Sequence, residues 1–278
     1  MSGTVTAPPD SGPAIQFEDV RLGFAEGDVL RGVSFQVQPR ETMILLGETG
    51  TGKTLTLKLA AGLLAPSAGV VRVLGKEVSS MHEEELLDFR RKIGFVFQEG
   101  ALFDSMTVGD NVAYRLREEH VHEEEIEPQV REVLRFIELE NTLELVPSEL
   151  SGGMRRRVSI ARALISQPQV VLYDSPTAGL DPVTSQTIIT LILRLRDVYG
   201  VTALLATQRL QDGFALANFH YDPQTKRVIR NARNGSAAAA AKAGRTRFLV
   251  YREGGVYFEG GPEELENSKD PYLQRFLV

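Results

Sequence analysis

A glycine-rich octapeptide stands between a short apolar run and a stretch of leucines at helical spacing, and this order constrains the fold more than any other feature. The apolar run covers 42–46, and the helical spacing continues to residue 64. The octapeptide between them consists of Gly47, Glu48, Thr49, Gly50, Thr51, Gly52, Lys53 and Thr54. Glycines let a tight loop aim several backbone N–H groups at one anion, and the helix that follows adds the positive end of its dipole. The sequence therefore predicts a phosphate-binding loop between a buried strand and a helix.

The octapeptide has the spacing of a P-loop, in which glycine and four further residues precede Gly-Lys-Thr. We expect Lys53 to contact the β- and γ-phosphates and the Thr54 hydroxyl to ligate Mg²⁺. A second apolar strand over 170–173 ends in Asp174, whose carboxylate can hold Mg²⁺ through water beside the loop. A glycine-rich turn without function is the alternative, and the strand and helix on either side disfavour it. The two motifs together predict a site for ATP and Mg²⁺.

Apolar runs alternate with helical patterns along most of the chain, which favours a largely parallel sheet covered on both faces. The expected strands lie at 42–46, 70–74, 93–97, 170–173, 201–206, 248–251 and 256–258, and the expected helices at 54–64, 82–92, 108–118, 127–137, 154–165, 183–198 and near 271–277. Alternation between 15 and 37 predicts an N-terminal antiparallel β subdomain. The helical stretch from about 100 to 165 predicts an inserted helical subdomain. We expect a single α/β nucleotide-binding domain over 15–278.

Two segments lack a regular pattern. Residues 1–14 are rich in Gly, Pro, Ser and Thr and predict a flexible tail, since they have neither the basic start nor the apolar core of a secretory signal. Residues 222–246 contain an alanine run and several Asn and Gly residues, and they predict a mobile surface insertion. A partner-docking element is the alternative for this insertion.

Composition narrows the class of protein. The 278 residues carry 31 Lys and Arg against 37 Asp and Glu, a net charge of −6, which disfavours sequence-independent nucleic-acid binding. There is no cysteine, which excludes disulfides, thiol nucleophiles and cysteine-ligated metals. No run of about 18 apolar residues exists to span a membrane. We therefore expect a soluble cytosolic protein whose membrane role, if it has one, requires a partner.

A second glycine motif points to a known family. Leu150, Ser151, Gly152, Gly153 and Met154 precede a basic helix, and alone they would indicate only a helix N-cap. However, the order of motifs along the chain resembles that of ABC ATPases. The motifs are the P-loop, Gln98, this glycine motif, Asp174 and the segment 176–182. The resemblance covers roughly residues 15–278. It implies an ABC-type P-loop NTPase fold with a mixed sheet core, a helical subdomain and an N-terminal antiparallel β subdomain.

The resemblance also implies roles for individual residues. Two subunits of this family face each other head to tail, so that each ATP lies between one P-loop and the partner's Ser151, Gly152 and Gly153. Gln98 would contact Mg²⁺, sense the γ-phosphate and couple it to a transmembrane partner, and Asp181 would cross the dimer interface. Phe24 lies where the family keeps an aromatic ring for stacking on adenine, with a core phenylalanine as the alternative.

Three stretches are similar to a narrower group, the ATPases of MCE-type, Mla-like bacterial lipid transporters. These stretches are 97–108, 111–114 and 147–154. The similarity implies a membrane permease and an MCE lipid-binding protein as partners, phospholipid as cargo, and a peripheral position on the cytoplasmic face of the inner membrane. The apolar residues that follow Gln98 lie near the expected permease contact, with ordinary subdomain core as the alternative.

Two positions depart from the family's catalytic set. The residue after Asp174 is usually a glutamate that polarises the attacking water, and here it is Ser175. The residue after the strand at 201–206 and Thr207 is usually a histidine, and here it is Gln208. Neither side chain can carry charge near neutral pH, so general-base catalysis of about 10²–10⁴-fold is expected to be lost while phosphate binding is kept.

Three explanations of these departures stay open. In the first, the chain hydrolyses ATP slowly with water oriented by other groups. In the second, it forms one half of an asymmetric heterodimer whose partner hydrolyses ATP. In the third, it is a degenerate, nucleotide-gated regulatory subunit with little hydrolysis. An ABC protein of translation or DNA repair is a further alternative, disfavoured because those proteins usually carry tandem cassettes or large insertions.

Overall fold

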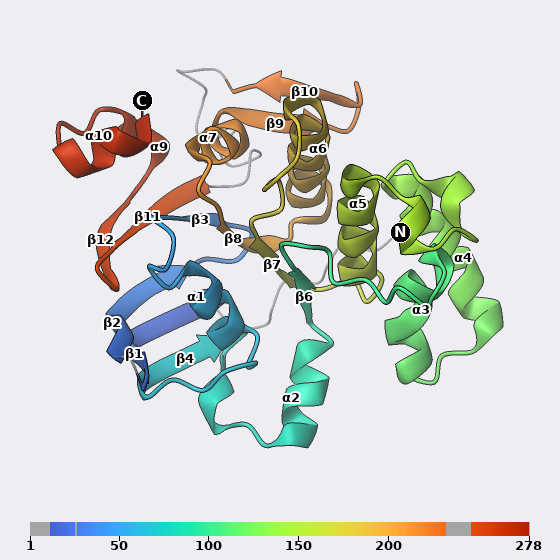
Figure 1. The fold of residues 1–278 in the computed structure, drawn as a ribbon, viewed down its shortest axis with the longest axis horizontal. Helices are drawn as coiled ribbons and strands as arrows, with labels where there is room; N and C mark the ends of the chain where they lie inside the picture. The colour runs from blue at the N-terminus through green and yellow to red at the C-terminus, as the bar shows by residue number, and fades with distance from the viewer. Residues whose placement is uncertain (1–11, 26, 232–245, 278) are drawn as a thin grey trace.

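The computed structural model describes residues 12–25, 27–231 and 246–277 and contains a central six-stranded sheet (Figure 1). The strand order is β12-β11-β3-β8-β7-β6, in which neighbouring strands are parallel except for the β12–β11 pair. Their bounds are β3 (Thr42–Leu46), β6 (Ile93–Val96), β7 (Val170–Asp174), β8 (Thr202–Ala206), β11 (Thr246–Arg252) and β12 (Gly255–Gly260). The mixed sheet predicted from the sequence is confirmed.

Side chains of the central strands alternate between two hydrophobic cores on opposite faces of this sheet. On β3, Ile44 and Leu46 enter one core, and Met43 and Leu45 enter the other. Because successive residues of a strand point to opposite faces, strands that are buried on both sides read as continuous apolar runs. This burial explains why β3, β7 and β8 were recognisable in the sequence.

One face of the sheet is covered by the N-terminal part of the chain. Helix α1 (Lys53–Ala60) packs there through Leu57 and Leu59, together with an antiparallel sheet of order β2-β1-β4-β5. The strands are β1 (Ile15–Phe24), β2 (Gly27–Val37), β4 (Ala68–Val73) and β5 (Lys76–Glu77), followed by η1 (Val78–Ser80) and α2 (Glu83–Arg90). Phe17 on β1 stacks on Phe35 of β2 with ring centroids 4.6 Å apart. The predicted antiparallel β subdomain is therefore present.

Helices cover the other face and extend beyond it. They are α3 (Val108–Glu118), α4 (Glu123–Phe136), η2 (Glu140–Thr142), η3 (Pro147–Glu149), α5 (Gly152–Leu164), α6 (Pro182–Tyr199) and α7 (Leu210–Asn218). Figure 1 shows α3 and α4, in green, beside α5 and away from the central sheet. Buried Asn111 of α3 holds the preceding loop by bonding the backbone of Phe103 and Met106. The expected subdomain bounds of about 100 and 165 stay a prediction.

The segment expected as an insertion at 222–246 begins within a hairpin. Strands β9 (Phe219–Asp222) and β10 (Arg227–Arg230) pair antiparallel, and 232–245 lie outside the described residues, as does most of the expected tail 1–14. The chain then continues through β11 and β12 to α9 (Pro262–Glu266) and α10 (Pro271–Leu277). In the described ranges, no helix combines the length and the apolar character that a membrane span requires.

A buried ion pair near the end of α6 fastens this helix to its neighbours. The side chains of Arg196 and Asp197 are only 2% and 4% exposed, and the shortest N–O distance between them is 2.6 Å. Arg196 also donates to the carbonyl oxygens of Leu216 and Phe219, and Asp197 accepts from the Tyr221 N–H. Satisfied partners on every side compensate for the loss of water around both charges.

Removing one member of this pair should destabilise the whole domain. We expect Asp197→Asn to lower the free energy of unfolding by about 3–5 kcal/mol, because the Arg196 guanidinium would stay buried without its counter-charge. Urea denaturation followed by circular dichroism measures the change. The matched control is Asp88→Ala, which breaks an exposed ion pair with Arg91 and should cost less than about 1 kcal/mol. Equal effects of the two variants would contradict this account.

Candidate functional site

The carboxyl ends of the parallel strands form one edge of the sheet, and the predicted motifs gather there. Gly47 follows β3, Asp174 ends β7, and Thr207 follows β8, which pairs with both of these strands. Gln98 lies in an exposed turn just after β6, which pairs with β7. Ligands of open α/β sheets bind beyond the carboxyl ends of the strands, so this edge is the candidate site.

Positive φ angles shape the loop between β3 and α1. Gly47 has φ +147°, Gly50 has φ +83°, and Gly52, the N-cap of α1, has φ +100°. A Cβ on Gly47 would approach the Tyr251 carbonyl oxygen to 3.0 Å, so glycine is required there for space as well. Thr51 closes the loop by donating from its hydroxyl to the Glu48 carbonyl oxygen at 2.9 Å.

The Lys53 ammonium lies inside this loop. Its Nζ donates to the carbonyl oxygens of Gly47 at 2.8 Å and Glu48 at 2.7 Å. Burial lowers the pKa of Lys53, while the nearby carboxylates of Asp174 and Glu48 act in the opposite direction. The loop therefore concentrates a cation and the N-terminus of α1 at one point, which is the arrangement that binds phosphate.

Thr54 and Asp174 meet beside the loop although 120 residues separate them. The Thr54 hydroxyl donates to Asp174 Oδ1 at 3.2 Å, and the Asp174 side chain is buried. A hydroxyl and a carboxylate are oxygen ligands of the kind Mg²⁺ prefers when it also contacts nucleotide phosphates. These two residues fit a Mg²⁺ site next to the phosphate loop.

Ser175 and Gln208, the two positions at which the resemblance implies a departure from the family, lie at the same edge. Ser175 has φ +45°, and its hydroxyl lies 3.4 Å from Asp174 Oδ1. Gln208 extends from the end of β8 and donates through Nε2 to the Thr49 hydroxyl of the phosphate loop at 3.2 Å. The structure therefore brings the neutral Gln208 side chain to the phosphate loop and the neutral Ser175 side chain to Asp174 beside it.

Arg156 is a residue of this region whose role the sequence alone does not indicate. Its guanidinium donates to the Phe97 carbonyl oxygen at 2.9 Å and to the Ala178 carbonyl oxygen at 3.2 Å. It thereby joins the turn that holds Gln98 to the turn that follows Ser175. Burial lowers the pKa of Arg156, opposed by the carboxylates of Glu99 and Asp174. Arg156 is the second of three consecutive arginines, and the sequence does not indicate which of the three side chains points inward.

The second glycine motif is not brought to the phosphate loop of the same chain. Ser151 caps α5 by accepting from the Met154 N–H at 3.2 Å, and a Cβ on Gly153 would collide with Thr184 of α6. Helix α5 packs into the core on one face of the central sheet, whereas α1 packs into the core on the other. The second glycine motif therefore lies at a different surface of the chain from the phosphate loop.

Two further predicted residues are exposed. Asp181 caps α6 by accepting from the Val183 and Thr184 N–H groups, and its hydrogen bonds with Thr184 lower the pKa of its carboxyl group. Phe24 ends β1 and is 54% exposed, so the alternative of a core phenylalanine is wrong. Both side chains are available to a ligand or a second subunit.

Comparison with known sequences shows what class of protein carries this arrangement. The family described as "ABC transporter" matches residues 30–178. The Arabidopsis thaliana chloroplast protein TRIGALACTOSYLDIACYLGLYCEROL 3 is 35% identical over 281 residues, which is 97% of this chain and 74% of the plant protein. MlaF of Haemophilus influenzae, named as the ATP-binding protein of an intermembrane phospholipid transport system, is 34% identical over 75% of this chain and 80% of MlaF. The methionine import protein MetN of Brucella abortus is 36% identical over 74% of this chain and 56% of MetN.

A solved structure shares the fold. It is a dimeric ATP-binding cassette, MJ0796, bound to ADP and phosphate, with a TM-score of 0.73 and 27% identity over 89% of this chain and 98% of that one. The fold and the loop thus define an ABC-type P-loop NTPase. The chain belongs to the ABC transporter family, as an ATP-binding subunit of the ABC ATPase type.

The Lys53 ammonium should be needed for nucleotide binding. We expect Lys53→Ala to weaken ATP affinity at least tenfold, because a charge-assisted bond to phosphate is lost from a buried position. A titration with a fluorescent ATP analogue measures the affinity. Lys58→Ala, on the same helix, is the matched control and should bind as the wild type does. Unchanged affinity in Lys53→Ala would refute the assignment of the loop.

Proposed function

We propose that this chain is the ATPase of a lipid transporter, and that its ATP cycle drives a membrane permease that moves phospholipid. The ATPase part is supported by one observation above all: Lys53 lies inside a phosphate-binding loop with Thr54 and Asp174 paired beside it. The lipid part is supported by two relatives, one named for a phospholipid transport system and one for a galactolipid. An MCE-type lipid-binding protein would be the third partner of the complex.

In this proposal each residue of the loop has a defined task. Backbone N–H groups between Gly47 and Thr54 bind phosphate oxygens, and Lys53 neutralises the β- and γ-phosphates. Phe24, exposed at the end of β1, stacks on the adenine ring. Mg²⁺ bound by Thr54, Asp174 and Gln98 would neutralise charge on the phosphates. Gln98 reports the occupied state to the permease through its exposed turn.

A second subunit completes the site. Because α1 and α5 lie on opposite faces of one sheet, a single chain cannot close Ser151, Gly152 and Gly153 over its own phosphate loop. A head-to-tail dimer places the motif of one chain over the loop of the other, and Asp181 caps α6 at that interface. The dimeric state of MJ0796, which shares the fold, supports this arrangement. The second subunit is either another copy or a related chain.

Hydrolysis is the step at which Ser175 and Gln208 matter. Neither group can accept a proton as a carboxylate can, so they orient water by hydrogen bonds alone. Positioning and charge neutralisation supply most of the catalysis in phosphoryl transfer, and Lys53 and Asp174 keep both. We therefore propose slow hydrolysis. The second candidate, a nucleotide-gated regulatory subunit with little turnover, is favoured by the same two neutral side chains.

Restoring the family's residues should separate these candidates. We expect the wild type to release phosphate from Mg-ATP above the level of Lys53→Ala, and Ser175→Glu with Gln208→His to raise kcat by about 10²-fold or more. Steady-state phosphate release measures both. Wild-type release at the Lys53→Ala level, with ATP still bound, would instead identify the regulatory subunit.

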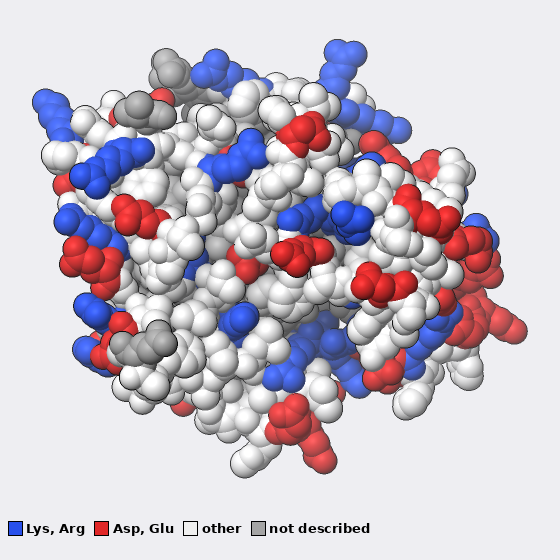
Figure 2. Space-filling model, viewed as in Figure 1, with Lys and Arg blue, Asp and Glu red and all other residues white. Residues whose placement is uncertain are grey.

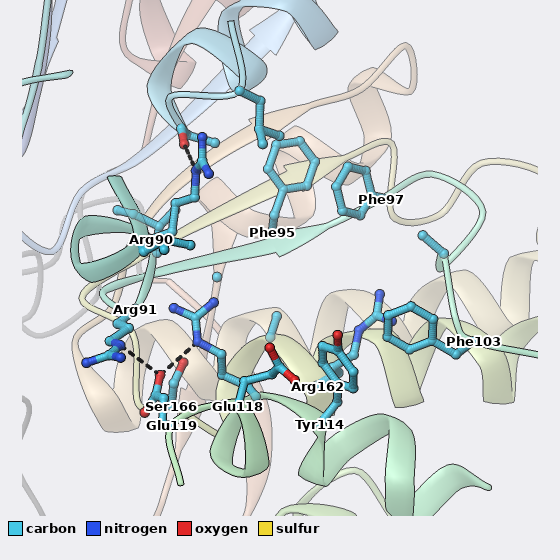
Figure 3. Close-up of a pocket in the computed structure, with 18 residues that line it drawn as sticks. Arg90, Arg91, Phe95, Phe97, Phe103, Tyr114, Glu118, Glu119, Arg162 and Ser166 are labelled. Carbon is cyan, nitrogen blue, oxygen red and sulfur yellow. Dashed lines mark hydrogen bonds and ion pairs between the residues drawn. The ribbon is translucent and has the colours of Figure 1, made fainter. Parts of the chain in front are cut away.

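A groove beside the turn of Gln98 is the proposed permease contact (Figure 3). It encloses about 550 Å³ between β6 and α2 on one side and α3 and α5 on the other. Phe95 and Phe97 stack at 4.1 Å on one wall, and Phe103 contacts Tyr114 on the other, with ring centroids 4.7 Å apart. Phe97 directly precedes Gln98, so a change in the conformation of the Gln98 turn would move the wall that contacts a segment bound in the groove.

Charge determines how the groove recognises a partner. Figure 3 shows Arg91 directed at Glu119, which also forms an ion pair with Arg115. The Arg162 guanidinium lies 5.6 Å from the centre of the Phe103 ring. Aromatic walls beside mixed charges suit an amphipathic permease segment. The acidic start of α4, which lies where Figure 2 shows red side chains at the right, would repel anionic lipid head groups. The chain would therefore reach the cytoplasmic face of the membrane through its permease.

Two proposals, phospholipid as the cargo and the groove as the permease contact, can be tested together on the complex of the chain with its permease. We expect phospholipid vesicles, and not methionine, to stimulate ATP hydrolysis several-fold. Phe103→Glu should abolish copurification and stimulation, because a carboxylate replaces the 40% exposed ring that faces the groove.

The control variant is Ile229→Glu, an equally exposed apolar position on β10. It should copurify and respond to phospholipid as the wild type does. Stimulation by methionine alone would favour an importer like MetN, and an undiminished response of Phe103→Glu would remove the groove from the permease contact.

A further inference from the structure

A buried carboxylate joins the two segments that carry Ser175 and Gln208. Asp212 lies in the first turn of α7 and is only 4% exposed. Its Oδ2 accepts from the hydroxyl of Thr177, two residues after Ser175, and from the hydroxyl of Thr207 at 3.4 Å. Thr177 and Thr207 are themselves buried, so both hydroxyls point inward at this carboxylate. Thr177 lies in the turn after β7, Thr207 follows β8, and Asp212 lies in α7.

Arg209 adds a second layer to this cluster. Its Nε lies 3.8 Å from Asp212 Oδ1, and its Nη1 donates to the Ser185 hydroxyl of α6 at 2.9 Å. Its backbone N–H donates to the Thr207 hydroxyl at 3.0 Å. Gln208 therefore sits between two residues that are each fixed by the same cluster. We call Thr177, Ser185, Thr207, Arg209 and Asp212 the Asp212 clamp.

The groups of the clamp contact one another on both sides of the carboxylate, because Asp212 Oδ2 accepts from two hydroxyls and Oδ1 faces the Arg209 guanidinium. Burial raises the pKa of Asp212, while the Thr177 hydroxyl, the Arg209 guanidinium and the Thr207 hydroxyl lower it. A buried polar network with complete partners holds one arrangement, because breaking any bond leaves a desolvated group unpaired. A further bond from the Ser175 N–H to the Ala206 carbonyl oxygen at 2.8 Å ties the same two segments.

We propose that the Asp212 clamp positions Gln208 and Ser175 relative to each other at the phosphate loop, and that Asp212 and Thr177 are positioning residues for ATP hydrolysis. The proposal rests on the proposed function. Two neutral side chains act on water only through the direction of their hydrogen bonds, so a small displacement removes their contribution. Gln208 reaches Thr49 across the sheet edge, and the clamp fixes the backbone from which it reaches.

The clamp also connects hydrolysis to the subunit interface. The turn that begins at Ser175 and contains Thr177 continues to Asp181, the exposed cap of α6 at the proposed dimer contact. If this turn moves when a second subunit docks, the hydrogen bond between Thr177 and Asp212 would transmit the movement to the segment that carries Gln208. The hydrogen bonds of Lys53 and Thr54 involve no residue of the clamp, which reaches the phosphate loop through the bond between Gln208 and Thr49. We therefore expect loss of the clamp to affect turnover more than ATP binding.

Two substitutions of Thr177 that differ in the hydroxyl group test the proposal. Thr177→Val removes the hydroxyl and keeps the shape, whereas Thr177→Ser keeps the hydroxyl. We expect Thr177→Val to lower kcat about tenfold, with KM for ATP within about twofold, and Thr177→Ser to recover the wild-type kcat. A purely structural role would lower the melting temperature without this split between kcat and KM. Equal kcat in Thr177→Val and the wild type would overturn the proposal.

Hydrogen exchange provides a readout that does not depend on turnover. We expect amides of 207–209 and 175–181 to exchange at least tenfold faster in Thr177→Val than in the wild type and in Thr177→Ser. Absence of wild-type hydrolysis above Lys53→Ala would refute the hydrolytic part of the proposed function, and unchanged exchange in Thr177→Val would refute the clamp. The two failures are therefore distinguishable on the same set of variants.

Discussion

Parallel pairing of β3, β8, β7 and β6 is the constraint on which the rest of the molecule depends, because it brings the ends of distant strands to one edge. Gly47, Asp174 and Thr207 are neighbours only through this pairing. The alternation of side chains then divides the helices between two faces. The same geometry that assembles the phosphate loop also separates it from Ser151. In the proposed dimer, each chain thus contributes one half of two sites instead of one whole site.

Features encoded in contiguous residues could be predicted from the sequence, and features created by tertiary contact could not. The phosphate loop, the strand ending in Asp174 and the glycines after Ser151 each carry their signal locally, and the fold class followed from their order. Arg156 and Asp212 carry no such signal, since an arginine in a basic run or an aspartate in an amphipathic helix usually faces solvent. The β9–β10 hairpin was passed over because its strands are short and half-exposed.

Ser175 and Gln208 are neutral, so in the proposed function their contribution to hydrolysis depends on the direction of their hydrogen bonds. Ser175 and Gln208 are attached to segments that are held by buried hydrogen bonds through Asp212, while Arg156 ties the same turn to that of Gln98. The hydrogen bonds of Lys53 to the loop carbonyl oxygens involve none of these residues. In the proposed function, a change in these contacts would alter the rate of turnover more than the affinity for nucleotide.

The position of β3 in the centre of the sheet has a consequence for how the chain is made. Its two neighbours, β8 and β11, lie far downstream, and Thr42 pairs with both Ala203 and Thr246. During synthesis from the N-terminus, β3 has no partner on either side until those strands have left the ribosome. Its five apolar or buried residues stay unpaired for most of translation, exposed to aggregation and to chaperones. The phosphate loop is therefore among the first motifs to be synthesised and among the last to be assembled.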